Sequence, residues 1–166
     1  MTVRERQRAE KILHDHEEKA VAASRLNPGA RETLTELHRR GIRVGVLTRN
    51  RKRNAEAVAA MHHLDFDAIV GREDGPVKPD AFGVRHLCQR FGVEPSETLL
   101  VGDYLFDLLC ARAAGATPVW ITNQQHGRDF SDQADFHIDE LTEILSLLDR
   151  QHGTKGPSSE EETSHV

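Results

Sequence analysis

The sequence lacks several features that mark whole classes of protein. Its formal net charge of −5 leaves no basic excess of the kind that attracts nucleic acid or an anionic membrane. No secretory signal and no long apolar run is present. There are only two cysteines, Cys88 and Cys110, at no regular spacing, which favours a reducing compartment. We therefore expect a cytoplasmic protein with neither a nucleic-acid nor a membrane partner.

What the chain does contain is an alternation of predicted strands and helices. With 166 residues, 37% of them hydrophobic, it is long enough for one compact domain. The alternation predicts an α/β fold with a parallel sheet. Strands are expected at residues 42–47, 68–70, 98–102, 117–122 and 136–138. Helices are expected at residues 2–24, 28–40, 51–62, 81–91, 104–114 and 140–150.

The stretch from Thr98 to Asp107 is the one around which the others are arranged. It reads as a buried strand that stops at Gly102 and presents Asp103 where a helix begins, the position at which doubly wound sheets place their ligands. Asp107 follows four residues later, so both carboxylates are expected on the opening turn of that helix. Such a pair suits Mg²⁺, which takes one or two protein carboxylates and several waters. The alternative is that both acids only cap the helix.

Two further polar residues are also expected at the carboxyl end of a strand or in the loop beside it. Thr48 ends a predicted strand, and its hydroxyl with the backbone N–H groups after it suits phosphate oxygens at a helix start. Lys78, in the loop before the next helix, supplies a point charge for the same oxygens. Alone, Thr48 is as easily a helix cap and Lys78 a surface residue. In this order, with Asp103 and Asp107, they predict a phosphate site with a bound metal.

These motifs resemble those of the haloacid dehalogenase (HAD) superfamily of phosphatases, in its phosphoglycolate phosphatase-like branch. The segment Leu47-Thr48-Arg49-Asn50 resembles the second motif of the family, Lys78-Pro79-Asp80 the third, and residues 102–107 the fourth. The resemblance covers about residues 27–148. It implies a Rossmann-like core with a parallel sheet, Mg²⁺ as cofactor and hydrolysis of a small phosphomonoester. A response-regulator-like fold with a coincidental GDxxxD would leave Thr48 and Lys78 unexplained.

The resemblance also implies roles and boundaries. Thr48, Arg49, Asn50 and Lys78 would bind phosphate, Thr48 and Lys78 would serve catalysis, and Asp103 and Asp107 would hold the metal. Residues 1–26 would be the remnant of a helical cap and residues 27–151 the HAD-like core. Residues 152–166 have too few apolar side chains to offset the entropy of ordering and are expected to form a disordered tail.

One motif of the family has no counterpart here. The family's nucleophile lies on a strand that ends in Asp-x-Asp, and no such strand precedes Thr48. Asp65-Phe66-Asp67 comes before its apolar run and reads as a loop that enters a strand. We therefore expect a chain that lacks the N-terminal strand and is inactive on its own. The alternative is a non-catalytic HAD-like domain that binds a phosphorylated ligand or a protein partner.

The strand without a counterpart would lie in the middle of the sheet. Its two neighbours would face a gap with unpaired backbone groups, each costing roughly 1 to 3 kcal/mol if buried. Either the two neighbours close on each other, or a strand enters from another copy or a partner, or the cost remains and the domain is only marginally stable. For the isolated chain we expect marginal stability. Self-association through this position is thus expected to be open to the chain.

Overall fold

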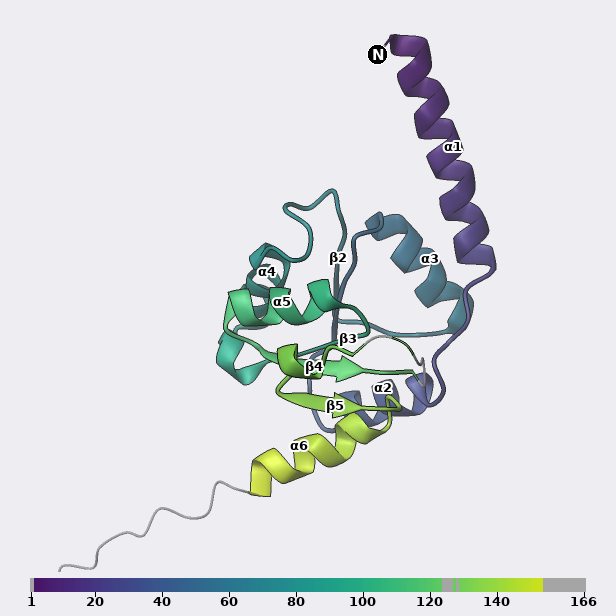
Figure 1. The fold of residues 1–166 in the computed structure, drawn as a ribbon. Helices are drawn as coiled ribbons and strands as arrows, with labels where there is room; N and C mark the ends of the chain where they lie inside the picture. The colour runs from purple at the N-terminus through teal and green to yellow at the C-terminus, as the bar shows by residue number, and fades with distance from the viewer. Residues whose placement is uncertain (1, 124–126, 128, 154–166) are drawn as a thin grey trace, which may run out of the picture.

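The computed structural model describes residues 2–123, 127 and 129–153, which form a layered α/β domain (Figure 1). Its strands are β1 (Gly45–Leu47), β2 (Ala68–Val70), β3 (Leu99–Gly102), β4 (Thr117–Ile121) and β5 (Phe136–Ile138). Its helices are α1 (Val3–Ala22), α2 (Ala30–Arg39), α3 (Lys52–His62), α4 (Phe82–Phe91), α5 (Leu105–Ala114) and α6 (Glu143–Gly153). All strand pairs are parallel, so the predicted α/β fold class is confirmed.

Some element boundaries differ from those expected. Helix α2 begins at Ala30 and not after Asn27, because Gly29 takes a left-handed conformation (φ 72°). A residue in this conformation is not part of a right-handed helix, so the first helical residue is the next one. Strand β1 is limited to three residues, since its partner β2 has only three. Helix α6 continues to Gly153, into the first residues of the expected tail. The remainder of that tail, residues 154–166, lies outside the described residues.

The strands form two separate sheets. Strand β1 pairs with β2, and β3, β4 and β5 pair in that order. Within the described residues β1 and β3 are not hydrogen-bonded to each other, so closure of these two strands is not adopted. All four residues of β3 are only half-buried, although helices pack on the sheet to which it belongs. The described strands thus form two small parallel sheets and not one continuous sheet.

Among the described residues, β1 and β3 each pair with a strand on one side only, so the other edge of each carries backbone groups with no partner in a sheet. In a parallel pair, successive residues of a strand bond alternately to one side and the other. The N–H of Thr48 donates to the carbonyl of Val70 at 3.0 Å, and that of Thr117 donates to Thr98 at 2.9 Å. The residues that alternate with these partners turn their N–H and C=O groups away from the paired strand. They are Gly45 and Leu47 on β1 and Leu99 and Val101 on β3.

Of the apolar clusters that hold helices on the strands, two lie on opposite faces of β3. On one face, Leu47 and Leu100 from the strands pack against a cluster built from α4, α5 and Ala116. On the other face, Leu99 and Val101 pack with β4, β5 and α6, where Val119 and Leu147 are almost completely buried. Successive residues of β3 therefore point to opposite faces, as the pleat of a strand requires. This packing fixes where β3 ends and α5 begins.

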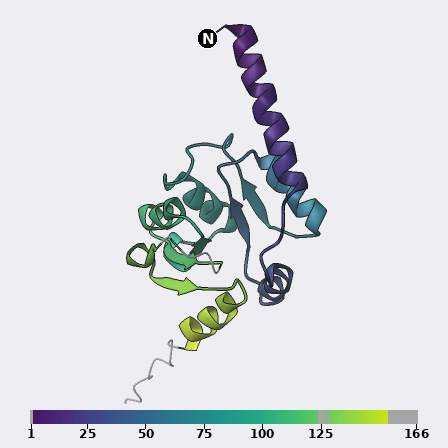
Figure 2. The same ribbon diagram turned by 45° about the vertical axis from the view of Figure 1, so that its right-hand side comes forward.

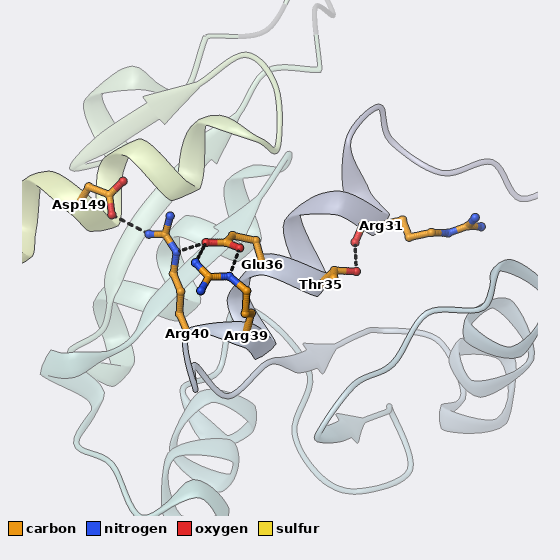
Figure 3. Close-up of polar contacts among 6 residues, drawn as sticks. All are labelled: Arg31, Thr35, Glu36, Arg39, Arg40 and Asp149. Carbon is orange, nitrogen blue, oxygen red and sulfur yellow. Dashed lines mark hydrogen bonds and ion pairs between the residues drawn. The ribbon is translucent and has the colours of Figure 1, made fainter.

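Helix α2 is joined to α6 by a charged cluster at the surface (Figure 3). Glu36 accepts hydrogen bonds from the guanidinium groups of Arg39 and Arg40, and Arg40 also reaches Asp149 on α6 at 2.6 Å. The two arginines hold the pKa of Glu36 at about 2. The carboxylate is therefore ionised at any ordinary pH, and the cluster ties α2 to α6 by exposed pairs of modest strength.

Helix α1 projects away from the layered body (Figures 1 and 2). Its carboxyl-terminal part leans on α3, where Nδ1 of His14 lies 2.6 Å from the Arg53 guanidinium. Just after the helix, the hydroxyl of Ser24 lies 2.9 Å from Nε2 of His62. Among the described residues no helix is both long and apolar enough to cross a membrane.

Candidate phosphate and metal site

Thr48 lies at the carboxyl end of β1 and is held there by two hydrogen bonds. Its N–H continues the pairing with β2 by donating to Val70 at 3.0 Å. Its Oγ1 accepts the N–H of Asn50 at 3.0 Å. Because this bond uses the oxygen only as an acceptor, the hydroxyl proton can be donated to a ligand oxygen. Thr48 is thus fixed at the edge of the sheet with a donor to offer.

The turn after Thr48 has fewer open N–H groups than expected. Oδ1 of Asn50 accepts the N–H of Arg51 at 2.8 Å and the Nδ2 group of Asn54 at 2.9 Å. The N–H of Lys52, at the start of α3, is taken by the Glu73 carboxylate at 3.0 Å. The chain therefore supplies its own anion to the start of this helix. Asn50 acts here by shaping the turn, and its predicted contact with phosphate stays a prediction.

The junction of β3 and α5 depends on close contact between Gly102 and Asp107. A Cβ atom at Gly102 would lie 2.2 Å from the Cβ of Asp107, so only glycine allows this approach. Oδ2 of Asp107 accepts the N–H of Tyr104 at 3.2 Å, which places the start of α5 at Leu105. Asp107 is buried and points back at the strand end, as predicted. Asp103 was expected on the same opening turn, but it lies before the helix and is exposed.

Lys78 makes the contact that joins two of the predicted motifs. Its Nζ donates to Oδ1 of Asp107, and both side chains are largely buried, with 15% and 9% of their surfaces exposed. A lysine so placed has lost most of its hydration, and the paired carboxylate compensates for this loss. The loop at residues 78–80 is further anchored by Cys110, whose thiol donates to the carbonyl of Asp80 at 3.0 Å. Burial raises the pKa of that thiol to about 11.

The two predicted metal-binding carboxylates differ in their surroundings. Asp107 is engaged by Lys78 and by the N–H of Tyr104. The Asp103 carboxylate is exposed and makes no hydrogen bond or ion pair with any residue that the structure describes. The described part of the chain also holds no group of three or more His, Cys, Asp or Glu side chains placed for a metal ion. One open carboxylate beside one tethered carboxylate fits a cation that keeps several water ligands, as Mg²⁺ does.

Arg49 and a set of aromatic rings were not predicted to meet. The Arg49 guanidinium lies over the Phe106 ring, with its central carbon 5.3 Å from the ring centroid. Phe106 contacts Tyr104 edge to face, Tyr104 contacts Phe130, and Phe130 contacts Trp120. Arg49 thus links the loop after β1 to the start of α5. The predicted contact of Arg49 with phosphate stays a prediction. The only signal in the sequence was that Tyr104 and Phe106 lie within the fourth motif.

Asp65-Phe66-Asp67, the only Asp-x-Asp of the sequence, lies at the opposite edge of the sheet. Asp67 directly precedes β2 and accepts the N–H of Val44 at 2.8 Å. It also receives a hydrogen bond from Arg43 at 2.6 Å and lies 3.3 Å from Nε2 of His38. The Val44 N–H and these side chains lower its pKa against the effect of burial. Asp67 is therefore a structural carboxylate in a loop that enters a strand, as predicted.

A separate hollow of about 310 Å³ lies between α1 and α3, away from the predicted site. Met61, Ala57 and Val21 give it an apolar floor, and His14, Glu18 and Arg53 give it a charged rim. None of the predicted phosphate or metal residues lines it. The side chains of α1 and α3 therefore do not fill the space between the two helices.

Comparisons with known proteins identify relatives of the chain. The model of haloacid dehalogenase-like hydrolases matches residues 2–115. A haloacid dehalogenase-like hydrolase domain-containing protein of Arabidopsis thaliana is 31% identical over 149 residues, covering 86% of this chain and 61% of that protein. The phosphoglycolate phosphatase of Haemophilus influenzae is 32% identical over 133 residues, covering 75% of this chain and 58% of the enzyme. The chain thus spans about three fifths of the length of these relatives.

Solved structures agree with the sequence matches. The crystal structure of a protein described as a predicted phosphoglycolate phosphatase from Haemophilus somnus superposes with a TM-score of 0.78 and 25% identity. The match covers 89% of this chain and 68% of that one. Since the family model also covers well over half of the sequence, the chain belongs to the haloacid dehalogenase-like hydrolases and is similar to their phosphoglycolate phosphatase branch.

Proposed function

We propose that this chain carries the phosphate- and Mg²⁺-binding part of a phosphomonoester phosphatase. The observation that carries the proposal is the contact of Lys78 with Asp107, which brings the third and fourth motifs of the family together at the carboxyl edge of the strands. Arg49, over Phe106, brings the second motif to the same edge. The phosphatase names of several relatives support this reading.

Each residue has a distinct task in this proposal. Thr48 donates its hydroxyl proton to a phosphate oxygen, and Lys78 offsets the negative charge of the phosphoryl group. Asp103 holds Mg²⁺, and Asp107 positions Lys78 and stands behind Asp103. When bound, the Mg²⁺ ion would neutralise further phosphate charge. The open carboxylate of Asp103 is the feature of this chain that best fits such an ion.

The nucleophile is the part that these 166 residues do not supply. The only Asp-x-Asp is committed to structure at the other edge of the sheet, through Asp67. We propose that the 166-residue chain by itself binds phosphate and does not turn over a phosphomonoester, because covalent catalysis needs an attacking group. Catalysis would require a carboxylate delivered to the carboxyl edge between β1 and β3.

The alternative function, a non-catalytic domain that binds a phosphorylated ligand or a protein partner, is favoured by one observation. The open edges of β1 and β3 can accept a parallel strand from another chain. In this alternative the added strand comes either from a partner protein or from a second copy of the chain. In the second case the domain self-associates. Size-exclusion chromatography tests this alternative. If two copies associate through these edges, a strand fused to the same chain should occupy the edges and abolish the self-association.

Two further features complete the proposal. Residues 1–26, which include α1, are the remnant of a helical cap, in keeping with their position before the core. The protein works in the cytoplasm on a small phosphorylated substrate, without a nucleic-acid partner. The two buried thiols of Cys88 and Cys110 support a reducing compartment, since both are free.

The proposal is tested by titrating inorganic phosphate into the isotopically labelled chain in the presence of Mg²⁺. Backbone NMR signals around Thr48, Lys78 and Asp103 are expected to shift together with one dissociation constant. Lys78→Ala should weaken that constant by about tenfold or more, because a buried charge-assisted hydrogen bond contributes roughly 1.5 to 3 kcal/mol. Lys19→Ala, an exposed lysine on α1, is the control and should leave the constant unchanged. Phosphate binding that ignores Lys78 would contradict the proposal.

A further inference from the structure

The chain is poor in aromatic residues, yet half of them gather at one place. Its one tyrosine, its one tryptophan and two of its six phenylalanines form a connected cluster. Ring centroids are 5.4 to 5.9 Å apart, and each pair meets edge to face. We call these residues the aromatic patch: Tyr104, Phe106, Phe130 and Trp120.

The aromatic patch directly adjoins the predicted phosphate and metal site. Tyr104 follows Asp103 in the chain, and Arg49, which lies over Phe106, follows Thr48. Trp120 is in register with Gly102, the last residue of β3. Its neighbours Val119 and Ile121 face α6, so Trp120 points to the opposite face of the sheet, the face on which Asp107 meets Gly102. The aromatic patch therefore borders the loop after β1, through Arg49, and the loop after β3, through Tyr104.

The patch is not a closed piece of core. Tyr104 is 41% exposed, and Phe106, Phe130 and Trp120 are half-buried, whereas Val119 and Ile121 beside Trp120 are buried. Partly exposed rings that contact one another form an apolar surface patch, and such patches often mark ligand-binding sites. Arg49 adds a positive charge at the same place, and both arginine and aromatic faces stack on planar, electron-rich rings.

We propose that the aromatic patch, with Arg49, binds the leaving group of the substrate and selects a planar unsaturated ring over a small aliphatic acid. This inference rests on the proposed function, because the phosphate site is what brings the leaving group to the patch. Tyr104 is the residue on which selection chiefly depends, since it is the most exposed ring and the neighbour of Asp103. The substrate class would then be aryl or nucleobase-bearing phosphomonoesters.

The test uses three phosphonates, which resemble phosphomonoesters but are not hydrolysed, so the binding measurement needs no nucleophile. Methyl-, cyclohexyl- and phenylphosphonate are titrated into the chain with Mg²⁺ by calorimetry. Phenylphosphonate is expected to bind about fivefold more tightly than methylphosphonate, as one added aromatic contact allows. Cyclohexylphosphonate, of similar size but not planar, should bind less tightly than phenylphosphonate.

Variants of the patch give the control. Tyr104→Leu should remove the preference for phenylphosphonate and leave methylphosphonate affinity unchanged, whereas Tyr104→Phe should retain the preference. Phe136→Leu, a ring of similar exposure on β5 outside the patch, should have no effect. Equal affinities for all three phosphonates in the native chain would overturn the inference while the phosphate site stands. Failure of every phosphonate and of inorganic phosphate to bind would overturn the proposed function itself.

Discussion

A fusion that adds an apolar strand ending in Asp-x-Asp ahead of residue 2 is expected to hydrolyse phosphomonoesters more than about a hundredfold faster than the 166-residue chain. The added strand should pair with the open groups of Gly45, Leu47, Leu99 and Val101, and its carboxylates would then emerge at the edge that holds Lys78 and Asp103. Since α1 leads away from the sheet (Figure 1) and its 20 residues extend about 30 Å, the linker must return over a similar length. About 25 flexible residues span roughly 25 to 30 Å.

The matched control for this prediction is the same fusion with Asn-x-Asn. Both fusions should unfold at a higher temperature than the 166-residue chain, because unpaired backbone groups on both edges become bonded. Only the Asp-x-Asp fusion should release phosphate from phenyl phosphate or 2-phosphoglycolate with Mg²⁺. An unchanged melting temperature in both fusions would show that the strand does not enter between β1 and β3. Equal activity of the two fusions would exclude the added carboxylates as the attacking group.

Gly102→Ala is expected to damage stability and site together. The new methyl group would overlap the Cβ and Cγ of Asp107, at 2.2 and 2.3 Å, so α5 must move away from β3. Overpacking of this kind typically costs about 1 to 3 kcal/mol, which corresponds to a fall of roughly 2 to 12 °C in the melting temperature of a chain of this length. The displaced Asp107 would also lose its contact with Lys78, so phosphate binding should weaken. Thermal unfolding and phosphate titration measure the two effects.

Gly92→Ala is the control that separates a loss of stability from a change at the phosphate site. Gly92 has a positive φ of 69° and nothing within 4 Å of the added methyl group, so the substitution costs only backbone strain at the end of α4. It should lower the melting temperature modestly and leave phosphate affinity unchanged. If Gly102→Ala kept native phosphate affinity, the close approach of Asp107 to the strand end would have no role in the site.

The alternation of elements was predictable because apolar runs and turn residues mark it directly. Strand β2 and strand β5 have the expected bounds, and α4 ends before Gly92 as expected. The start of α2 was not predictable from Asn27 and Pro28, since the left-handed conformation of Gly29 decides it. The short 3₁₀ helix at Pro95–Glu97 was also missed, because so short an element has no periodicity to detect.

From the sequence, the predicted site could be derived only from the order and direction of the strands. Carboxyl ends of parallel strands share an edge of a sheet, so the sequence predicts that Thr48, Lys78 and Asp103 lie together, and for Thr48 and Asp103 this stays a prediction. The specific pairing of Lys78 with Asp107 and the separation of Asp103 from the helix depend on side-chain packing around Gly102. Contacts between distant rings, such as Tyr104 with Phe130, follow from no local pattern.

The central claim is that Thr48, Lys78 and Asp103 serve one site in which phosphate and Mg²⁺ bind together. Calorimetric titration of inorganic phosphate with and without Mg²⁺ tests it most directly. In the native chain Mg²⁺ should tighten phosphate binding by about tenfold, a typical coupling between two ligands. Asp103→Asn should abolish that gain, and Asp65→Asn, an exposed aspartate at the opposite edge, should retain it. Phosphate affinity that is the same with and without Mg²⁺ in the native chain would contradict the claim.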